Sequence, residues 1–152
     1  MVAKFYRPGR WSDAQILEEH AFSAELAAEE IPVAAPLRLE VDPSSPLQVM
    51  LSGAPPTLGT VSIAEGTYRF AVSQRKAGRA PELEQPATLE WIGRFLARIH
   101  TVGARQPFAV RPALTVQTFA EEPLQWLLAH DMVPLDVQSA WTRGVEKAIA
   151  AI

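Results

Sequence analysis

The sequence contains no cysteine, so disulfide frameworks and thiolate metal sites are excluded. It also has no apolar run near the ~20 residues that a membrane-spanning helix needs. Lys and Arg form no dense cluster, and the net charge of -3 argues against binding to nucleic acid. We therefore expect neither a membrane nor a nucleic acid among the partners of this protein.

The remaining composition is that of an ordinary globular protein. Hydrophobic residues make up 48% and charged residues 20% of the 152 positions, and a chain of this length can bury one real core. The N-terminus carries Lys4 and Arg7 but lacks the hydrophobic stretch of a signal peptide. These features predict one domain, or two small packed lobes, in a cytoplasmic protein of bacterial type.

The first half of the chain reads as a strand, a helix and further strands. Val2–Tyr6 is expected to form a strand. A helix then begins at Ser12, with Gln15 as the reciprocal partner of a capping box. It runs to about Glu30, because Pro32 disfavours helical geometry in the residue before it. Four strand candidates follow at the spacing of an antiparallel meander: Leu37–Val41, Leu47–Leu51, Thr60–Ile63 and Tyr68–Ser73.

The second half is polar at first and then helical. Gln74–Pro86 contains glycine, prolines and three basic residues, which predicts a boundary between lobes. Helices are expected around Leu89–Gly103, at Val116–His130 and, more weakly, at Gln138–Ile152. Strands followed by helices predict an α+β fold in which the sheet and the helices are segregated. The expected divisions are a small lobe (1–73), a linker (74–86) and a helical segment (87–152).

A charged residue stands inside the first predicted strand. Lys4 lies among apolar neighbours, and Glu19 shares a face of the following helix with Phe22 and Leu26. A carboxylate on a core-facing stripe needs a cationic partner, because burying it alone costs on the order of several kcal/mol. Lys4 is the obvious candidate. Spacing alone nevertheless favours a simpler interpretation, in which Lys4 protects an edge strand and Glu19 is a solvated acid.

The residues around Lys4 and Glu19 change this preference and favour a functional ion pair. The segments Lys4–Trp11, Gln15–Phe22 and Ile31–Pro36 closely resemble the aminoglycoside phosphotransferase/choline kinase-like family, and within it the bacterial serine/threonine protein kinases of the stress response. The resemblance continues through Thr67–Val72 and Ile92–His100. It covers most of the chain, apart from the variable stretch Leu39–Ile63.

The resemblance implies a partial kinase-like fold, in which an antiparallel sheet with one packed helix precedes an all-helical segment. It implies that Lys4 contacts the phosphates of ATP and that Glu19 holds and aims this lysine. The backbone of Ser73, Gln74 and Arg75 is expected where the family binds adenine. The intact family uses ATP and Mg²⁺, and its protein-kinase branch transfers the γ-phosphate to serine or threonine of a protein substrate.

The family's catalytic loop, of the His-Gly-Asp type and followed by Mg²⁺ ligands, does not occur in these 152 residues. The three histidines are followed by alanine, threonine and aspartate. We therefore expect a central fragment of such a kinase, with no turnover by itself, weak or no ATP binding, and no catalytic or metal-ligating residues. The alternative is a non-catalytic binding or oligomerising module, which would form a homo-oligomer through its first strand.

Other residues favour structural roles. His100 closes an apolar helical face that includes Leu96 and Ile99, so we expect it to be a hydrogen-bonded structural residue. Trp91 and Phe95 are expected to pack as an i, i+4 pair. His20 is next to Glu19 in the sequence, but the spacing supplies no further ligands for a metal.

Overall fold

The computed structural model describes the whole chain, residues 1–152, as two compact units, Met1–Val110 and Arg111–Ile152. The N-terminal unit comprises β1 (Val2–Tyr6), α1 (Asp13–Ala28), β2 (Val49–Ser52), β3 (Leu58–Ile63), β4 (Gly66–Ser73) and α2 (Pro86–Gly103). The C-terminal unit comprises a π-helical turn (Gln117–Glu121), α3 (Glu122–Ala129) and α4 (Leu135–Ile149). This order of strands and helices confirms the predicted α+β fold class. None of the helices combines the length and hydrophobicity needed to cross a lipid bilayer.

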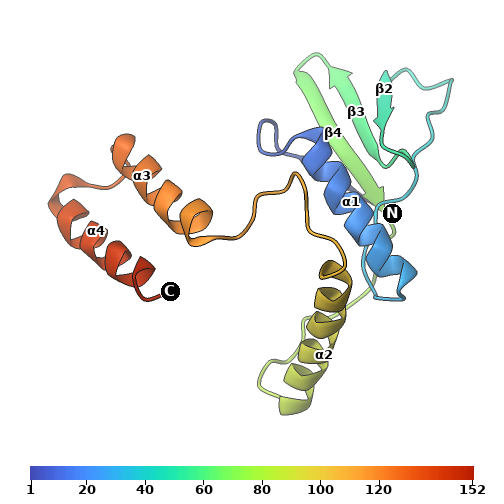
Figure 1. Cartoon of the computed structure of the whole chain (residues 1–152). Coiled ribbons are helices and arrows are strands. Elements are labelled where there is room, and N and C mark those ends of the chain that lie inside the picture. Colours follow the sequence, from blue (N-terminus) through green and yellow to red (C-terminus); the bar gives the residue numbers. More distant parts are fainter. The chain divides into compact units, whose positions relative to one another are not determined.

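The four strands form one antiparallel sheet in the order β1-β4-β3-β2. Figure 1 shows β4, β3 and β2 of this sheet. β2, β3 and β4 correspond to the last three of the four strands predicted for the meander. β1 pairs with β4 over its full length, from Val2 opposite Ser73 to Tyr6 opposite Arg69. The first strand of the chain is therefore an edge strand, and it lies beside the last strand of the sheet in sequence.

Successive side chains along each strand point to opposite faces of the sheet. One face packs against α1, where Tyr6, Ile16, Leu58 and Ala71 form a buried cluster. Lys4 lies two residues before Tyr6 and thus on this same side of β1. Phe5 points the other way, is 62% exposed, and packs beside its cross-strand neighbour Phe70, with 5.9 Å between the ring centroids.

Helix α1 begins as its sequence predicts. Ser12 is the N-cap, its hydroxyl accepts from the backbone N–H of Gln15, and the Gln15 side chain accepts from the Ser12 N–H. The helix ends at Ala28, two residues earlier than expected, because Glu30 turns the chain with a φ of 56°. Arg98 of α2 donates to the backbone carbonyl of Glu29 just beyond this end, where the helix dipole favours a cation.

Helix α2 packs against α1 through a second core cluster. Leu26 and Ile31 are buried against Val102, with Phe95 and Ile99 packed around them. The buried face of α2 therefore differs from the predicted one. Leu89, Leu96 and His100 are exposed, because the side that meets α1 is centred on positions 95, 99 and 102.

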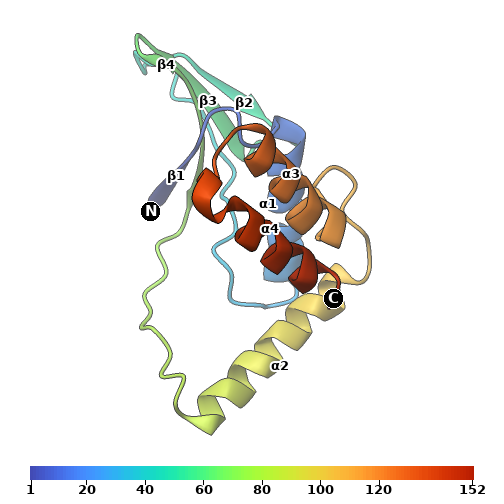
Figure 2. The same cartoon turned by 90° about the vertical axis from the view of Figure 1, so that its left-hand side faces the viewer.

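This packing joins α2 to α1, and both belong with the sheet to one compact unit. Residues 74–85 contain no helix or strand and run from β4 to the start of α2 (Figure 2). The division into a small lobe (1–73), a linker (74–86) and a helical segment (87–152) stays a prediction.

The strand predicted at Leu37–Val41 is wrong. Leu37 donates to Val72 O of β4, whereas Leu39 donates to Pro56 O in a loop. Because the segment divides its hydrogen bonds between two partners, it forms only an isolated bridge from Pro36 to Ser73.

In the C-terminal unit, the helix predicted at Val116–His130 is interrupted. Pro123 has no N–H to continue the helical hydrogen bonds, and a π-helical turn occupies Gln117–Glu121 before α3 starts. The helix predicted at Gln138–Ile152 begins three residues earlier, at Leu135, because Pro134 stands at its N-cap and its fixed φ suits the entry into a first turn.

Candidate functional site

The structure brings Lys4 and Glu19 together. Lys4 Nζ donates to Glu19 Oε1 across 3.1 Å, from the edge strand β1 to the middle of α1. The Lys4 side chain is 59% exposed and that of Glu19 34%, so the pair lies at the surface, in contrast to the buried carboxylate that the helical spacing suggests. An exposed pair contributes only about 0–1 kcal/mol to stability. The contact holds the ammonium group of Lys4 beside the Glu19 carboxylate.

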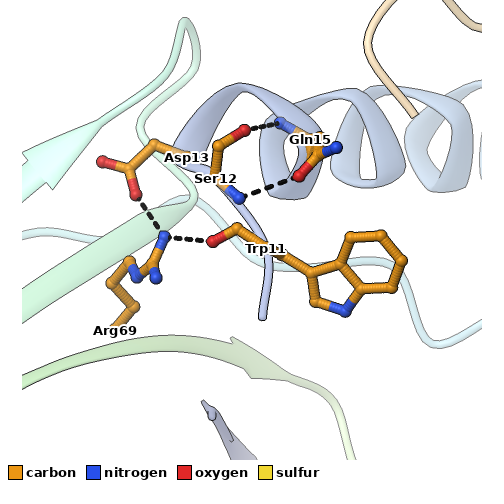
Figure 3. Close-up of polar contacts among 5 residues, drawn as sticks. All are labelled: Trp11, Ser12, Asp13, Gln15 and Arg69. Carbon is orange, nitrogen blue, oxygen red and sulfur yellow. Dashed lines mark hydrogen bonds and ion pairs between the residues drawn. The ribbon is translucent and has the colours of Figure 1, made fainter. Parts of the chain in front are cut away.

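A cluster around Arg69 fixes the start of α1 on the sheet (Figure 3). Arg69 of β4 donates through Nη1 to the backbone carbonyl of Trp11 at 2.6 Å and to Asp13 Oδ1 at 2.7 Å. Its side chain is only 20% exposed. The capping box of Ser12 and Gln15 lies directly beside these contacts. The first turn of α1 is thereby tied to the strand that pairs with β1.

A buried polar chain lies next to the ion pair. The Tyr6 hydroxyl and His20 Nε2 form a 2.7 Å hydrogen bond, and His20 Nδ1 and Thr57 Oγ1 form another of 2.9 Å. His20 is only 4% exposed. Burial is the main cause that lowers the pKa of His20. The Lys4 charge lowers it further, and the Glu19 charge opposes them. The imidazole is therefore neutral at pH 7 and has a partner at each nitrogen.

The opposite side of α1 holds the segment that follows α2. Glu18 accepts hydrogen bonds from the backbone N–H groups of Ala109 and Val110, and Gln15 Nε2 donates to Val110 O at 3.0 Å. Phe22 meets Phe108 edge to face, with 5.3 Å between the ring centroids. These contacts limit rotation of α1, and thus the direction in which Glu19 points.

A small depression lies beside the ion pair. It is lined by Lys4, Tyr6, Glu19, Ser23, Ala34, Pro36, Ala71, Val72 and Ser73. Its volume of about 70 Å³ is far below the roughly 300–1,000 Å³ of a small-molecule pocket. This space is too small to enclose a nucleotide.

The three predicted hinge residues are not equally close to Lys4. Ser73 lines the depression and pairs with Val2 of β1 on one side and Pro36 on the other. Gln74 and Arg75 are exposed residues of the irregular segment that follows β4, and neither lines the depression.

The described residues do not fit a Mg²⁺ site. Nowhere in residues 1–152 do three histidine, aspartate or glutamate side chains come together as metal ligands. A divalent cation bound here would need oxygen ligands beyond those that the chain brings together.

Sequence reasoning missed the supporting residues of this site. Tyr6 shares the side of β1 with Lys4, a period-2 relationship that was available in the sequence. His20 follows Ile16 by four positions and so shares its buried helix face. Thr57 and Arg69 carried no local signal, because their partners are 37 and 56 or more positions away.

An antiparallel sheet with one packed helix, followed by helices, matches the partial kinase-like fold that the sequence predicts. The profile of the phosphotransferase enzyme family matches residues 1–151, and the chain belongs to this family.

Curated relatives carry kinase names. The chain is 32% identical over 151 residues to the serine/threonine protein kinase RdoA of Salmonella typhimurium and to stress response kinase A of Salmonella choleraesuis. It is 31% identical to stress response kinase A of Escherichia coli K12. Each alignment covers 99% of this chain and 40% of the relative, so the chain spans two-fifths of the length of these proteins.

Proposed function

We propose that residues 1–152 form the nucleotide-anchoring part of an ATP-dependent serine/threonine protein kinase. The observation that carries this proposal is the 3.1 Å contact of Lys4 Nζ with Glu19 Oε1 at the rim of a small depression. The family supports it at the level of phosphotransfer, and the name of one relative supports the serine/threonine specificity. Because ATP is the donor, we place the reaction in the cytoplasm.

In this proposal Lys4 supplies a positive charge to the phosphates of ATP. Lysine is a point charge on a flexible four-carbon stem, so its direction must come from a partner. Glu19 gives that direction because α1 is fixed at its first turn by Arg69 and along its side by the 109–110 segment. Adenine would bind against the backbone at Ser73, Gln74 and Arg75, where β4 leads into the connector.

We further propose that the 152-residue chain by itself does not turn over ATP. Phosphoryl transfer needs an acceptor-orienting residue and metal-assisted stabilisation of charge. The sequence has no His-Gly-Asp, and its His130-Asp131 pair does not replace it. His130 stacks on Trp126 with 4.2 Å between the ring centroids, and its Nδ1 lies 2.8 Å from the Trp126 carbonyl oxygen. This places the histidine in a local helix-end contact.

A coupled or radiolabelled ATPase assay tests the absence of turnover. The expected result is a rate equal to buffer for both the wild-type chain and the Lys4→Ala variant. Turnover in the wild type that Lys4→Ala abolishes would contradict it.

A chimera tests the kinase assignment itself. Residues 1–151 replace the aligned segment of the Salmonella typhimurium kinase, and phosphate transfer from ATP to a protein serine or threonine is measured. We expect transfer by the chimera and its loss in a chimera that carries Lys4→Met. A folded chimera with equal activity in both forms would overturn the role of Lys4, and a folded but inactive one would overturn the assignment.

The second candidate function is a non-catalytic assembly module. It is favoured by the position of β1 at the edge of the sheet, where Val2 is 47% and Phe5 62% exposed. Exposed edge strands recruit partner strands, which would make a homo-oligomer. Size-exclusion chromatography with light scattering tests it: a stable dimer supports it, and a monomer at high concentration counts against it.

A further inference from the structure

The ammonium group of Lys4 has a second neighbour besides Glu19. It lies 4.7 Å from the centroid of the Tyr6 ring, close enough for a cation–π interaction. The Tyr6 ring and the Glu19 carboxylate thus both contact the ammonium group of Lys4. We propose that Tyr6 and His20 are positioning residues, which hold Lys4 in place for the phosphate of a nucleotide. The nucleotide part of this inference rests on the proposed function.

The strand geometry makes Tyr6 suited to this task. Tyr6 and Lys4 are two positions apart on β1, so their side chains lie on the same side of the sheet and run next to each other. Tyr6 is 6% exposed and packs in the core cluster with Ile16 and Ala71, so its ring is held rigidly. A rigid ring beneath a flexible lysine reduces the directions that the ammonium group can take.

The tyrosine is in turn held by His20. Its hydroxyl lies 2.7 Å from His20 Nε2, and Thr57 Oγ1 lies 2.9 Å from the other ring nitrogen. One imidazole nitrogen donates and the other accepts, so both hydroxyl groups are satisfied by a neutral ring. The chain of contacts therefore runs from Thr57 on the core side, through His20 and Tyr6, to Lys4 at the surface.

A neutral His20 also protects the ion pair. His20 follows Glu19 directly on α1, and a charged imidazole there would compete with Lys4 for the carboxylate. The lowered pKa of His20, caused mainly by its burial, keeps this second cation away at pH 7. Tyr6 and His20 thus combine an attractive contact to Lys4 with the absence of a competing charge.

Lysine-selective ¹³C labelling with NMR tests the positioning without any nucleotide. The chain has three lysines, so Lys76 and Lys147 serve as internal controls for Lys4. We expect the ε-proton resonance of Lys4 to be shifted upfield by the Tyr6 ring. Tyr6→Leu is expected to remove the shift, and Tyr6→Phe, which keeps the ring but loses the bond to His20, to reduce it. A Lys4 resonance that coincides with the two controls, or that Tyr6→Leu leaves unchanged, would overturn the proposal.

Two His20 variants separate positioning from mere packing. His20→Gln retains groups that can hydrogen-bond both hydroxyls, and His20→Leu retains only apolar volume. We expect the upfield shift to survive in His20→Gln and to decrease in His20→Leu, in samples whose circular dichroism shows a folded chain. Equal shifts in both variants would overturn the role of His20.

An ATP titration connects the positioning to function. From the usual strength of a cation–π contact, Tyr6→Leu is expected to weaken ATP binding by about 3- to 10-fold. If the Lys4 shift depends on Tyr6 but Lys4→Met binds ATP as tightly as the wild type, the proposed function fails while Tyr6 still positions Lys4. If ATP binds equally to wild type and Tyr6→Leu, the positioning proposal fails and the proposed function stands.

Discussion

Lys4 Nζ and Glu19 Oε1 lie 3.1 Å apart, although the two residues are separated by 15 positions in the sequence. The strand and the helix that carry them are held by separate sets of contacts. β1 pairs with β4 over five residues, and Arg69 of that same strand ties down the first turn of α1. The geometry of the pair is therefore a consequence of how α1 is fastened to the sheet.

The ion pair is expected to matter little for stability. In Glu19→Gln the free energy of unfolding should fall by less than ~1 kcal/mol, because both side chains are partly exposed and solvent screens their attraction. Urea denaturation measures this. A loss of several kcal/mol would show that the contact supports the fold instead of aiming the lysine.

Stability should depend on pH through His20. Its pKa is lowered in the folded chain, so the unfolded state binds a proton first as the pH falls below about 6.5. Stability is therefore complete above that pH and decreases below it, by at most about 1.4 kcal/mol per pH unit. Unfolding curves between pH 8 and 5 measure the slope.

Two histidine variants provide the controls for this slope. In His20→Gln the dependence should become shallower, because the buried titrating group is gone. His100→Gln removes an exposed histidine and controls for the loss of a histidine as such. Equal slopes in His20→Gln and wild type would contradict the assignment to His20.

Arg69 should contribute more to stability than the ion pair of the site. Arg69→Met removes two hydrogen bonds from a mostly buried guanidinium, so we expect a loss of about 1.5–3 kcal/mol. Asp13→Asn keeps the bond to the Trp11 carbonyl and should cost less, about 0–1 kcal/mol. Arg94→Met, which breaks only the exposed pair with Glu90, should cost under ~0.5 kcal/mol. Equal losses in the Arg69 and Arg94 variants would contradict this ranking.

Much of this arrangement could be predicted from local signals. The capping box of Ser12 and Gln15 identifies the start of α1, and the pattern of Val2–Tyr6 identifies the strand that carries Lys4. The partners Thr57 and Arg69 could not be found this way, because a side-chain contact across the fold leaves no spacing in the sequence. Pro123 was a local signal that was missed, and it explains why the predicted helix at 116–130 begins with a π-helical turn.

Substitution by alanine should have opposite effects on stability at Gly59 and Gly93. A Cβ on Gly59 would lie 2.5 Å from the Phe70 ring, so Gly59→Ala forces that ring away from Phe5 and should cost about 1–3 kcal/mol. Gly93 lies within α2 with open space around it, so Gly93→Ala should stabilise the helix by up to ~1 kcal/mol. Thermal unfolding measures both, and a destabilising Gly93→Ala would contradict the description of α2.

The most direct test is an ATP titration of the 152-residue chain, followed by tryptophan fluorescence, with wild type, Lys4→Met and Lys76→Met. Lys76 belongs to the connector after β4 and is the matched control. We predict weak, saturable binding by wild type and Lys76→Met. The loss of one charge-assisted hydrogen bond should weaken binding by Lys4→Met about 10- to 100-fold. Identical titrations of wild type and Lys4→Met would contradict the claim that Lys4 anchors a nucleotide.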